Sequence, residues 1–297
     1  MKKQRIRVYP NRIETYFEPP LQLFVLKETP PFHVMSAEFA GVLEGDRFET
    51  EIIVEPGAYV LLSTREASKL MSMPAQGARH DWRIVLRANA QLVSLPHEII
   101  PFAQSDFTQS VHCELEPGAS LVWGEVVIAG RLARHEYFQF RHFHSRLTIT
   151  PTDSSIPLYH DNLCLKPGQS GLRHGEDNWG SFGAWGSLVA IRNDATRDGF
   201  TSPPLEYALD IRSRPYSFEG KKEGEQQLAG NPVRRQYQGL SALQGGFIWR
   251  MMADQPEDIH DRMRERAKDA ESQKFPAPET FPAPKAREKL SVSAAFG

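Results

Sequence analysis

Short runs of Val, Ile, Leu and Phe, separated by turn residues, fill the first half of the chain. This spacing is typical of β-strands, and helical periodicity is scarce until the C-terminal region. Three segments repeat one pattern of strand, small-residue turn and strand: "IIVEPGAYVLLS" from Ile52, "IVLRANAQLVSL" from Ile84 and "CELEPGASLVWG" from Cys113. Because the turns recur about every 30 residues, the pattern indicates stacked supersecondary units.

The repeat predicts a mainly β protein, built as a β-helical, solenoid-like stack of short strands in which each coil buries its inward side chains on the next. A weaker fourth unit is expected in "RLTITPTDSSIPLYHDNLCLKPGQS", from Arg146. A β-sandwich whose hairpins resemble one another is the alternative.

The C-terminal region carries strand signals and one helix signal. "NWGSFGAWGSLVAI" predicts a buried strand with close backbone contacts at its glycines, and "GGFIWRMM" predicts a final strand. Between them, residues 192–239 are rich in turn residues, so we expect long loops there, with a short strand at "LEYALDI".

A helix is expected at about residues 254–272. Asp254 can cap its N-terminus, Pro256 suits the first turn, and Ile259, Met263 and Ala267 form a thin apolar stripe at fourth-residue spacing. We therefore predict a single β-rich domain over residues 1–274 that ends in this helix. Residues 275–297, rich in Pro and Ala, are expected to form an extended or flexible tail.

Composition excludes several classes of partner. The chain has 297 residues with a formal net charge of −2, which gives no electrostatic argument for nucleic acid or an anionic membrane. Two cysteines, Cys113 and Cys164, are too few for a disulfide scaffold and suit a reducing compartment. The basic start lacks a following apolar region, and no apolar run approaches the roughly 20 residues of a membrane helix. We expect a cytoplasmic protein.

Motifs for common enzyme chemistry are missing from the sequence, which has no nucleophile elbow and no phosphate-binding loop with its lysine. His142 and His144 lie two residues apart, so on a strand they share a face and could bind one metal ion, as in a cupin-like enzyme with Glu136 as a third ligand. Glu136 precedes the pair, whereas such a ligand should follow it, which favours a structural role for the histidines. Asp46, Glu136 and Asp161 stand near turns, where each taken alone favours a backbone cap.

Two long stretches resemble a known family. "GVLEGDRFETEIIVEPGAYVLLSTREASKL" and "LPHEIIPFAQSDFTQSVHCELEPGASLVWGEVVIAGRLARHEYF", in order between Gly41 and Asp161, are similar to the urease accessory protein UreD (UreH) family, with a fainter match at "GGFIWRMM". The resemblance implies a β-rich solenoid that is not an enzyme. It also implies complexes with the accessory proteins UreF and UreG, and docking on apo-urease during nickel insertion.

The resemblance also marks individual positions. The matching residues are Asp46 with Gly41 and Gly45 in a Gly-Gly-Asp element, Thr64, Ser68 and Lys69 in a second element, and Arg131 with Glu136 in a third. Ala40 and Glu44 stand where the family usually has glycine, and Arg65 and Glu66 add a charge pair. The usual C-terminal ending is replaced by "PAPKAREKLSVSAAFG", in the region where the resemblance implies contacts with UreF.

These observations predict an accessory protein with no tightly bound cofactor, acting as a scaffold or metallochaperone component. In one hypothesis a polar interior route, lined by Asp46, Glu136 and Asp161, carries Ni²⁺ to urease, because oxygen ligands release the ion as well as bind it. In a second, the chain is a structural adaptor whose acidic residues are caps and which binds no nickel. The third is the cupin-like enzyme.

Overall fold

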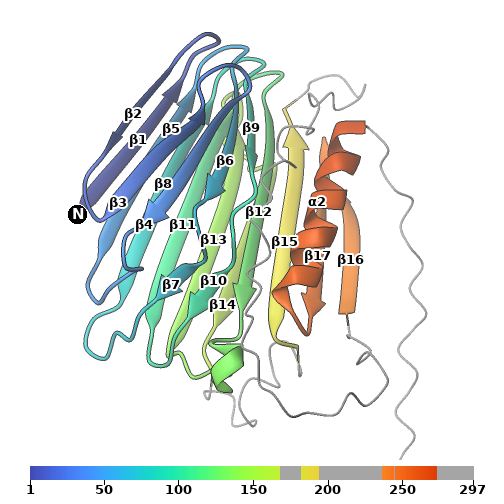
Figure 1. Cartoon of the computed structure of the whole chain (residues 1–297). Helices are drawn as coiled ribbons and strands as arrows, with labels where there is room; N and C mark the ends of the chain where they lie inside the picture. Colours follow the sequence, from blue (N-terminus) through green and yellow to red (C-terminus); the bar gives the residue numbers. More distant parts are fainter. Residues whose placement is uncertain (168–181, 194–235, 244, 273–297) are drawn as a thin grey trace, which may run out of the picture.

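The computed structural model describes residues 1–167, 182–193, 236–243 and 245–272, which form a β-solenoid of about four turns followed by a helix (Figure 1). The seven-stranded sheet has the order β14 (Tyr159–Leu165), β13 (His142–Pro151), β11 (Asp106–Leu115), β8 (Ala78–Leu86), β5 (Arg47–Val54), β1 (Lys2–Val8), β2 (Ile13–Phe17). The ten-stranded sheet has the order β16 (Gln236–Leu243), β17 (Gly246–Ala253), β15 (Ala184–Arg192), β12 (Ser120–Ile128), β9 (Gln91–Ser94), β6 (Tyr59–Thr64), β4 (Phe32–Glu38), β3 (Leu21–Lys27), with the short strands β7 (Ser68–Leu70) and β10 (Ile99–Pro101) beside it.

Each coil contributes one strand to each sheet, as the repeat predicts. β5, β8 and β11 pair in parallel in one sheet, and β6, β9 and β12 pair in parallel in the other. The turns between them place Gly57, Asn89 and Gly118 at φ of 69°, 57° and 75°. These left-handed conformations explain why Gly and Asn recur at the turns. Parallel pairing identifies stacked coils and excludes a sandwich of hairpins.

The predicted fourth unit differs from the expectation. β13 continues the stack in parallel with β11, but β14 turns back and pairs antiparallel with β13. The segment is therefore a hairpin at the edge of the seven-stranded sheet, because its chain reverses after Pro151 instead of crossing to the opposite sheet. This reversal brings the side chains of β14 beside those of β13.

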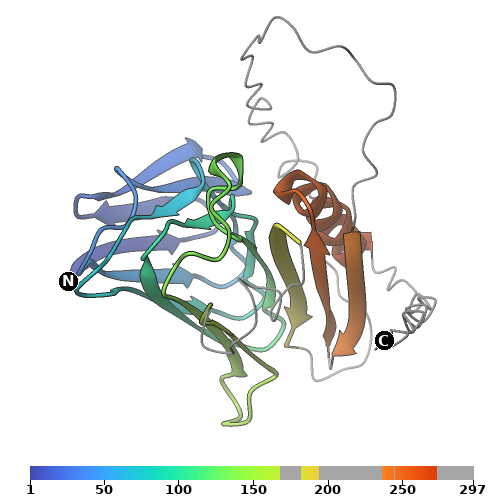
Figure 2. The ribbon, with the colours of Figure 1, turned by 90° about the horizontal axis from the view of Figure 1, so that it is seen from below.

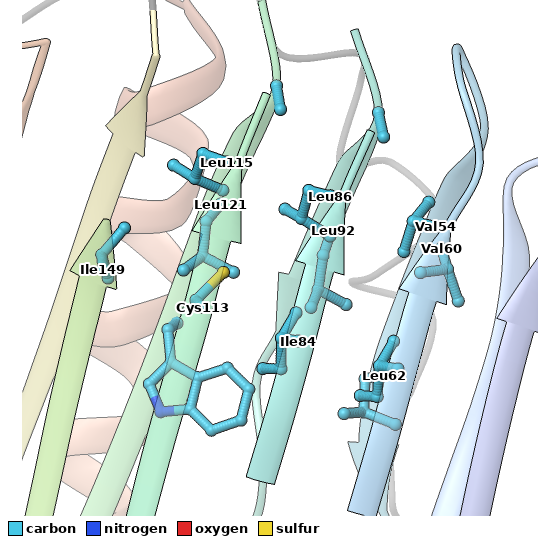
Figure 3. Packing of buried hydrophobic residues seen from close by; sticks show 14 of the residues in the cluster. Val54, Val60, Leu62, Ile84, Leu86, Leu92, Cys113, Leu115, Leu121 and Ile149 are labelled. Atoms are coloured by element: carbon cyan, nitrogen blue, oxygen red, sulfur yellow. The ribbon is translucent and has the colours of Figure 1, made fainter. Parts of the chain in front are cut away.

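Aliphatic side chains stack from coil to coil near the turns. Val54, Leu86 and Leu115 occupy paired positions in one sheet, and Val60 and Leu92 occupy paired positions in the other (Figure 3). All five are buried, with at most 1% of their surface exposed. Alternation along β5, where every second residue is buried, directs this set inward. This ladder is part of the largest hydrophobic cluster among the described residues.

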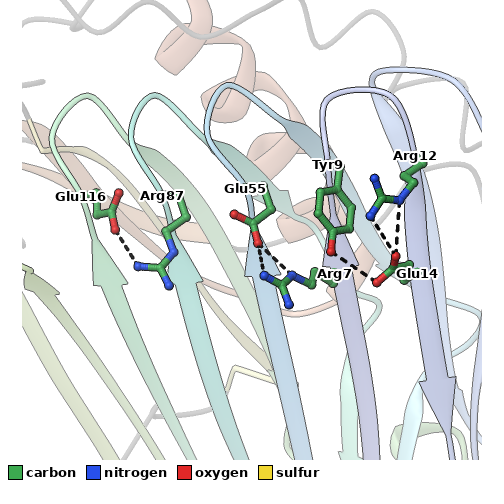
Figure 4. Close-up of polar contacts among 7 residues, drawn as sticks. All are labelled: Arg7, Tyr9, Arg12, Glu14, Glu55, Arg87 and Glu116. Atoms are coloured by element: carbon green, nitrogen blue, oxygen red, sulfur yellow. Dashed lines mark hydrogen bonds and ion pairs between the residues drawn. The ribbon is translucent and has the colours of Figure 1, made fainter.

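Ion pairs join neighbouring strands on the outer surface of the solenoid, at the same end as this aliphatic ladder. Arg7 contacts Glu55 at 2.6 Å and Arg87 contacts Glu116 at 2.7 Å (Figure 4). Exposed pairs of this kind contribute about 0–1 kcal/mol each, so the register rests mainly on the buried ladder.

The predicted C-terminal strand and helix are present. β15 and β17 extend the sheet beyond β12 by antiparallel pairing, and the helix α2 (Pro256–Ser272) lies against this extension (Figure 2). Ile259, Met263 and Ala267 are at most 2% exposed, so the apolar stripe is fully buried. A Cβ added at Gly186 would lie 2.3 Å from Cγ2 of Ile259, which confirms the close approach predicted for this strand.

No helix in the described part of the chain is both long and apolar enough to cross a membrane. The predicted strand at "LEYALDI" and the tail at residues 275–297 lie outside the described residues.

Candidate functional site

A row of polar side chains crosses the inner face of the seven-stranded sheet. One strand after another contributes to it: Gln4 (β1), Thr50 (β5), His80 (β8), Gln109 (β11) and Ser145 (β13), all buried. Gln4 Nε2 donates to Thr50 Oγ1 at 2.8 Å, and Thr50 Oγ1 lies 2.7 Å from His80 Nε2. Gln109, which pairs in register with both His80 and Ser145, donates to Ser145 Oγ at 2.9 Å. Its members lie on five neighbouring strands of the sheet.

This row separates two apolar clusters inside the solenoid. On β11, Phe107 belongs to one cluster and Val111 to the other, and Gln109 lies between them. Phe48 and Ile52 flank Thr50 on β5 in the same way. The row shifts by two residues between β5 and β8, because Thr50 pairs in register with Trp82 and His80 with Phe48. The polar layer therefore runs obliquely between the two apolar clusters.

Glu125 faces the row from β12 in the opposite sheet. Its Oε2 accepts hydrogen bonds from Gln109 Nε2 and, at 2.7 Å, from Ser145 Oγ. Only 7% of the residue is exposed. Burial, together with the negative charge of Asp161, raises the pKa of Glu125 to about 7, although the two hydrogen bonds oppose this shift. The carboxyl group therefore changes its charge near neutral pH.

A cavity of about 60 Å³ adjoins Glu125. It is lined by polar groups of several coils, among them Glu38, Thr64, Ser68 and Gln109. Ser68 Oγ donates to Glu38 Oε2 at 3.1 Å, and burial raises the pKa of the Glu38 carboxyl group. Glu38 ends β4, near the first coil, whereas Glu125 lies on β12. The cavity thus spans the stack between two carboxyl groups.

A second cavity of about 20 Å³ also lies beside Glu125. Trp123 and Glu125 line both cavities, so both cavities adjoin these side chains. Asp161 on β14 lines the second cavity, where its Oδ2 accepts a hydrogen bond from Arg250 at 2.9 Å. We call the series of Glu38, first cavity, Glu125, second cavity and Asp161 the polar passage.

The first cavity suits water. Nε1 of Trp82, which lines it, is buried and has no hydrogen-bond partner among the described residues. A cavity needs about 10–15 Å³ and polar partners to hold one water molecule, so the first has room for several. His80 adds a neutral imidazole, since burial lowers its pKa to about 3.

Two of the three acidic residues predicted to line a route have local structural contacts. Asp46 Oδ2 accepts the backbone N–H of Leu43 at 2.8 Å and so caps its own turn. Glu136 accepts the N–H of Ala103 at 2.6 Å and pairs with Arg131. Although burial opposes its ionisation, these bonds lower the pKa of Glu136. Asp161 alone of the three is found among the residues lining the two cavities.

The motif residues divide into two groups. Thr64 and Ser68 line the first cavity, so the second motif contributes directly to the polar passage. Gly41 and Gly45 adopt φ of 84° and 77° and shape the turns before β5. Lys69 forms a surface pair with Glu66 at 2.6 Å.

The histidine pair lies on the outer face of the seven-stranded sheet. His142 and His144 share that face as predicted, with ring centroids 5.8 Å apart. Glu136, which the cupin-like hypothesis places beside them, is engaged by Arg131 and Ala103 instead. Cys164 of β14 approaches the pair, because it is the direct cross-strand partner of His144.

Sequence reasoning missed Glu38 and Glu125. A signal for Glu125 was present, since it interrupts the apolar run "LVWGEVVI", where a carboxylate is rarely buried without partners. Its partners Gln109 and Ser145 are distant in sequence and meet it only through the coil register.

Comparison with known proteins identifies the family. A family model described as UreD urease accessory protein matches residues 4–280. The chain belongs to the UreD family. Urease accessory protein UreD 2 of Brucella suis biovar 1 is 32% identical over 154 residues, 51% of this chain and 50% of that one. UreD 2 of Synechococcus sp. is 36% identical over 138 residues, 46% of this chain and 51% of that one.

The more distant match has the family's other name. Urease accessory protein UreH of Helicobacter pylori strain J99 is 27% identical over 157 residues, 52% of this chain and 58% of that one. The chain spans about half the length of the curated relatives it matches. The solenoid fold of the structure agrees with the fold that the resemblance to this family implies.

Proposed function

We propose that this chain is a urease accessory protein that acts in the cytoplasm as a non-catalytic scaffold and metallochaperone component. It binds UreF and UreG, docks on apo-urease and assists nickel insertion, and the polar passage is the interior route for Ni²⁺. The observation that supports the route is the pair of cavities that both adjoin Glu125, beside the polar row that crosses the coils.

The chemistry of the polar passage supports transit of a metal ion. Its carboxyl groups, Glu38, Glu125 and Asp161, belong to three different strands, and they do not converge on one point as a three-ligand group among the described residues. Separate oxygen ligands hold Ni²⁺ weakly. With an association rate on the order of 10⁶ M⁻¹s⁻¹, a micromolar site empties about once a second, which suits a relay.

The test is nickel loading of urease in cells that lack their own UreD-type protein but have matched UreF, UreG and urease. We expect the chain to restore loading, and Glu38→Gln, Glu125→Gln and Asp161→Asn to reduce it while each variant stays folded. Glu116→Gln is the matched control, because Glu116 lies outside the solenoid in an exposed pair with Arg87.

The adaptor hypothesis predicts a different result. If the three variants together load urease as well as the original chain, and equilibrium dialysis detects no nickel above background, the chain holds its partners in register without conducting the ion. Failure of the original chain to restore loading, when it is expressed and folded, contradicts the accessory role in that set of partners.

Asp46 and Glu136 remain predictions for the same route. Asp46→Ala tests the first: lower urease activation by a folded variant supports a role in nickel transfer, and normal activation removes Asp46 from the mechanism. Glu136→Gln gives the same test for the second residue.

A further inference from the structure

We propose that His142, His144 and Cys164 form a binding site for a thiophilic divalent transition metal such as Zn²⁺ on the outer face of the seven-stranded sheet. One ligand atom from each residue lies within 4.8 Å of the others. This site is separate from the polar passage, because the side chains of Ser145 and Asp161 on the same two strands line the interior cavity. It does not rest on the proposed function.

The antiparallel pairing of β13 and β14 brings the three ligands together. His142 and His144 are two residues apart on β13 and point to the same face. His144 pairs directly with Cys164 across the antiparallel hairpin, and Cys164 Sγ lies 3.8 Å from Nε2 of His142. Two ligands of a tetrahedral Zn²⁺, with Zn–N near 2.1 Å and Zn–S near 2.3 Å, are about 3.5 Å apart. A shift of a few tenths of an ångström completes this contact.

Neighbouring oxygens orient both imidazoles. Nδ1 of His142 lies 3.2 Å from Oδ1 of Asp106, and Nε2 of His144 lies 2.6 Å from Oδ1 of Asn162. Each ring therefore donates its N–H to an oxygen acceptor and keeps the lone pair of its other nitrogen for a metal ion. A carboxylate–histidine contact of this kind is the usual outer support of a metal-binding histidine.

The chemistry of the three ligands determines which metal ions the site favours. Thiolate and imidazole ligands favour Zn²⁺, Ni²⁺ and related ions over Mg²⁺ and Ca²⁺. Cys164 is exposed, so an ion can reach it, whereas Cys113 is buried in the core. Three protein ligands leave a fourth position for water or an incoming ligand. Binding releases the thiol proton, since the thiolate is the ligand form.

Titration of the reduced full-length chain with Co²⁺ tests the site, because a cobalt–thiolate bond gives a charge-transfer band in the near ultraviolet. We expect one equivalent of Co²⁺ with this band, and displacement by Zn²⁺ but not by Mg²⁺. Cys164→Ser should abolish the band, whereas His160→Gln, which removes another exposed histidine on the same face, should keep it.

Asp106→Asn separates positioning from ligation, and we expect it to keep the band with affinity about 10–100-fold lower. Circular dichroism checks that each variant is folded. No band in the original chain with its exposed thiol shown to be reduced, or unchanged Co²⁺ binding by Cys164→Ser, would overturn the proposal. Glu125→Gln should leave the band unchanged, so this result is independent of nickel transit through the interior.

Discussion

Arg250 Nη2 lies 2.9 Å from Asp161 Oδ2, so a strand of the ten-stranded sheet contacts the edge strand of the seven-stranded sheet at the second cavity. A guanidinium at this position neutralises the carboxylate and competes with any metal ion for it. The end of the polar passage at Asp161 thus carries a cation, which a nickel ion on the proposed route would have to displace.

Removing Asp161's charge should slow nickel transfer. With Asp161→Asn we expect a rate of urease loading about tenfold lower, as the loss of roughly 1.4 kcal/mol of binding would give. Arg250→Gln should have the opposite effect on affinity and raise the nickel bound in equilibrium dialysis, because the competing cation is gone. Asp153→Asn is the control, since Asp153 is exposed and lines neither cavity. Equal loading by Asp161→Asn and Asp153→Asn would contradict the prediction.

Glu125 should make the protein less stable as the pH rises towards neutrality. Its folded-state pKa of about 7 lies above the ordinary value of 4.5, so between these pH values the folded carboxyl keeps a proton that the unfolded one has released. The free energy of unfolding therefore falls across this window, by about 3 kcal/mol from this group.

Denaturant unfolding of the original chain and Glu125→Gln at pH 5 and pH 8 measures that contribution. The variant should lose less stability between the two pH values than the original chain, because its side chain does not ionise. Equal losses in both would show that Glu125 titrates near its ordinary value.

The packing of helix α2 against β15 should depend on Gly186 having no side chain. Ile259→Ala removes a fully buried side chain and should cost about 2–5 kcal/mol of stability. Gly186→Ala should cost about 1–3 kcal/mol, because its Cβ would overlap Cγ2 of Ile259. In the double variant that overlap is absent, so we expect a cost below the sum. Additivity within about 0.5 kcal/mol would show that the two positions are not coupled.

Gly41 should tolerate alanine poorly. Its φ of 84° disfavours any L side chain, and an added Cβ would lie 2.5 Å from the carbonyl oxygen of Lys69. We expect Gly41→Ala to cost more than the roughly 1–2 kcal/mol of the left-handed conformation alone. Gly57→Ala isolates that conformational cost, since its φ is 69° but no atom lies within 4 Å of the added Cβ. Thermal unfolding that ranks Gly57→Ala as equally or more destabilising would contradict the steric argument.

The coils and the helix were predictable because their signals are local. The Pro-Gly and Ala-Asn turns fix left-handed residues between strands, and the stripe of Ile259 and Met263 has the period of a helix. The reversal into β14 was not predictable in the same way. Its strand pattern resembles that of another coil, and only the pairing with β13 distinguishes the two.

The candidate sites were less predictable from the sequence, because strand pairing brings together residues that are far apart along the chain. Asp46 and Glu136 stood out in the sequence as acidic residues near turns, and capping and pairing are the contacts that the structure gives them. Glu125 lies in a strand of buried residues, and its partners come from β11 and β13. Likewise, the shared face of His142 and His144 followed from their spacing, but the approach of Cys164 depends on the hairpin.

The parallel register of the coils makes the length of the polar layer a stepwise quantity. Neighbouring strands lie about 4.8 Å apart, and β5, β8 and β11 each contribute one member of the polar row. Insertion or deletion of a whole coil would change the distance between Glu38 and Asp161 by one such step. A partial insertion would instead move polar side chains into the apolar clusters. The number of coils therefore sets the length of the interior between Glu38 and Asp161.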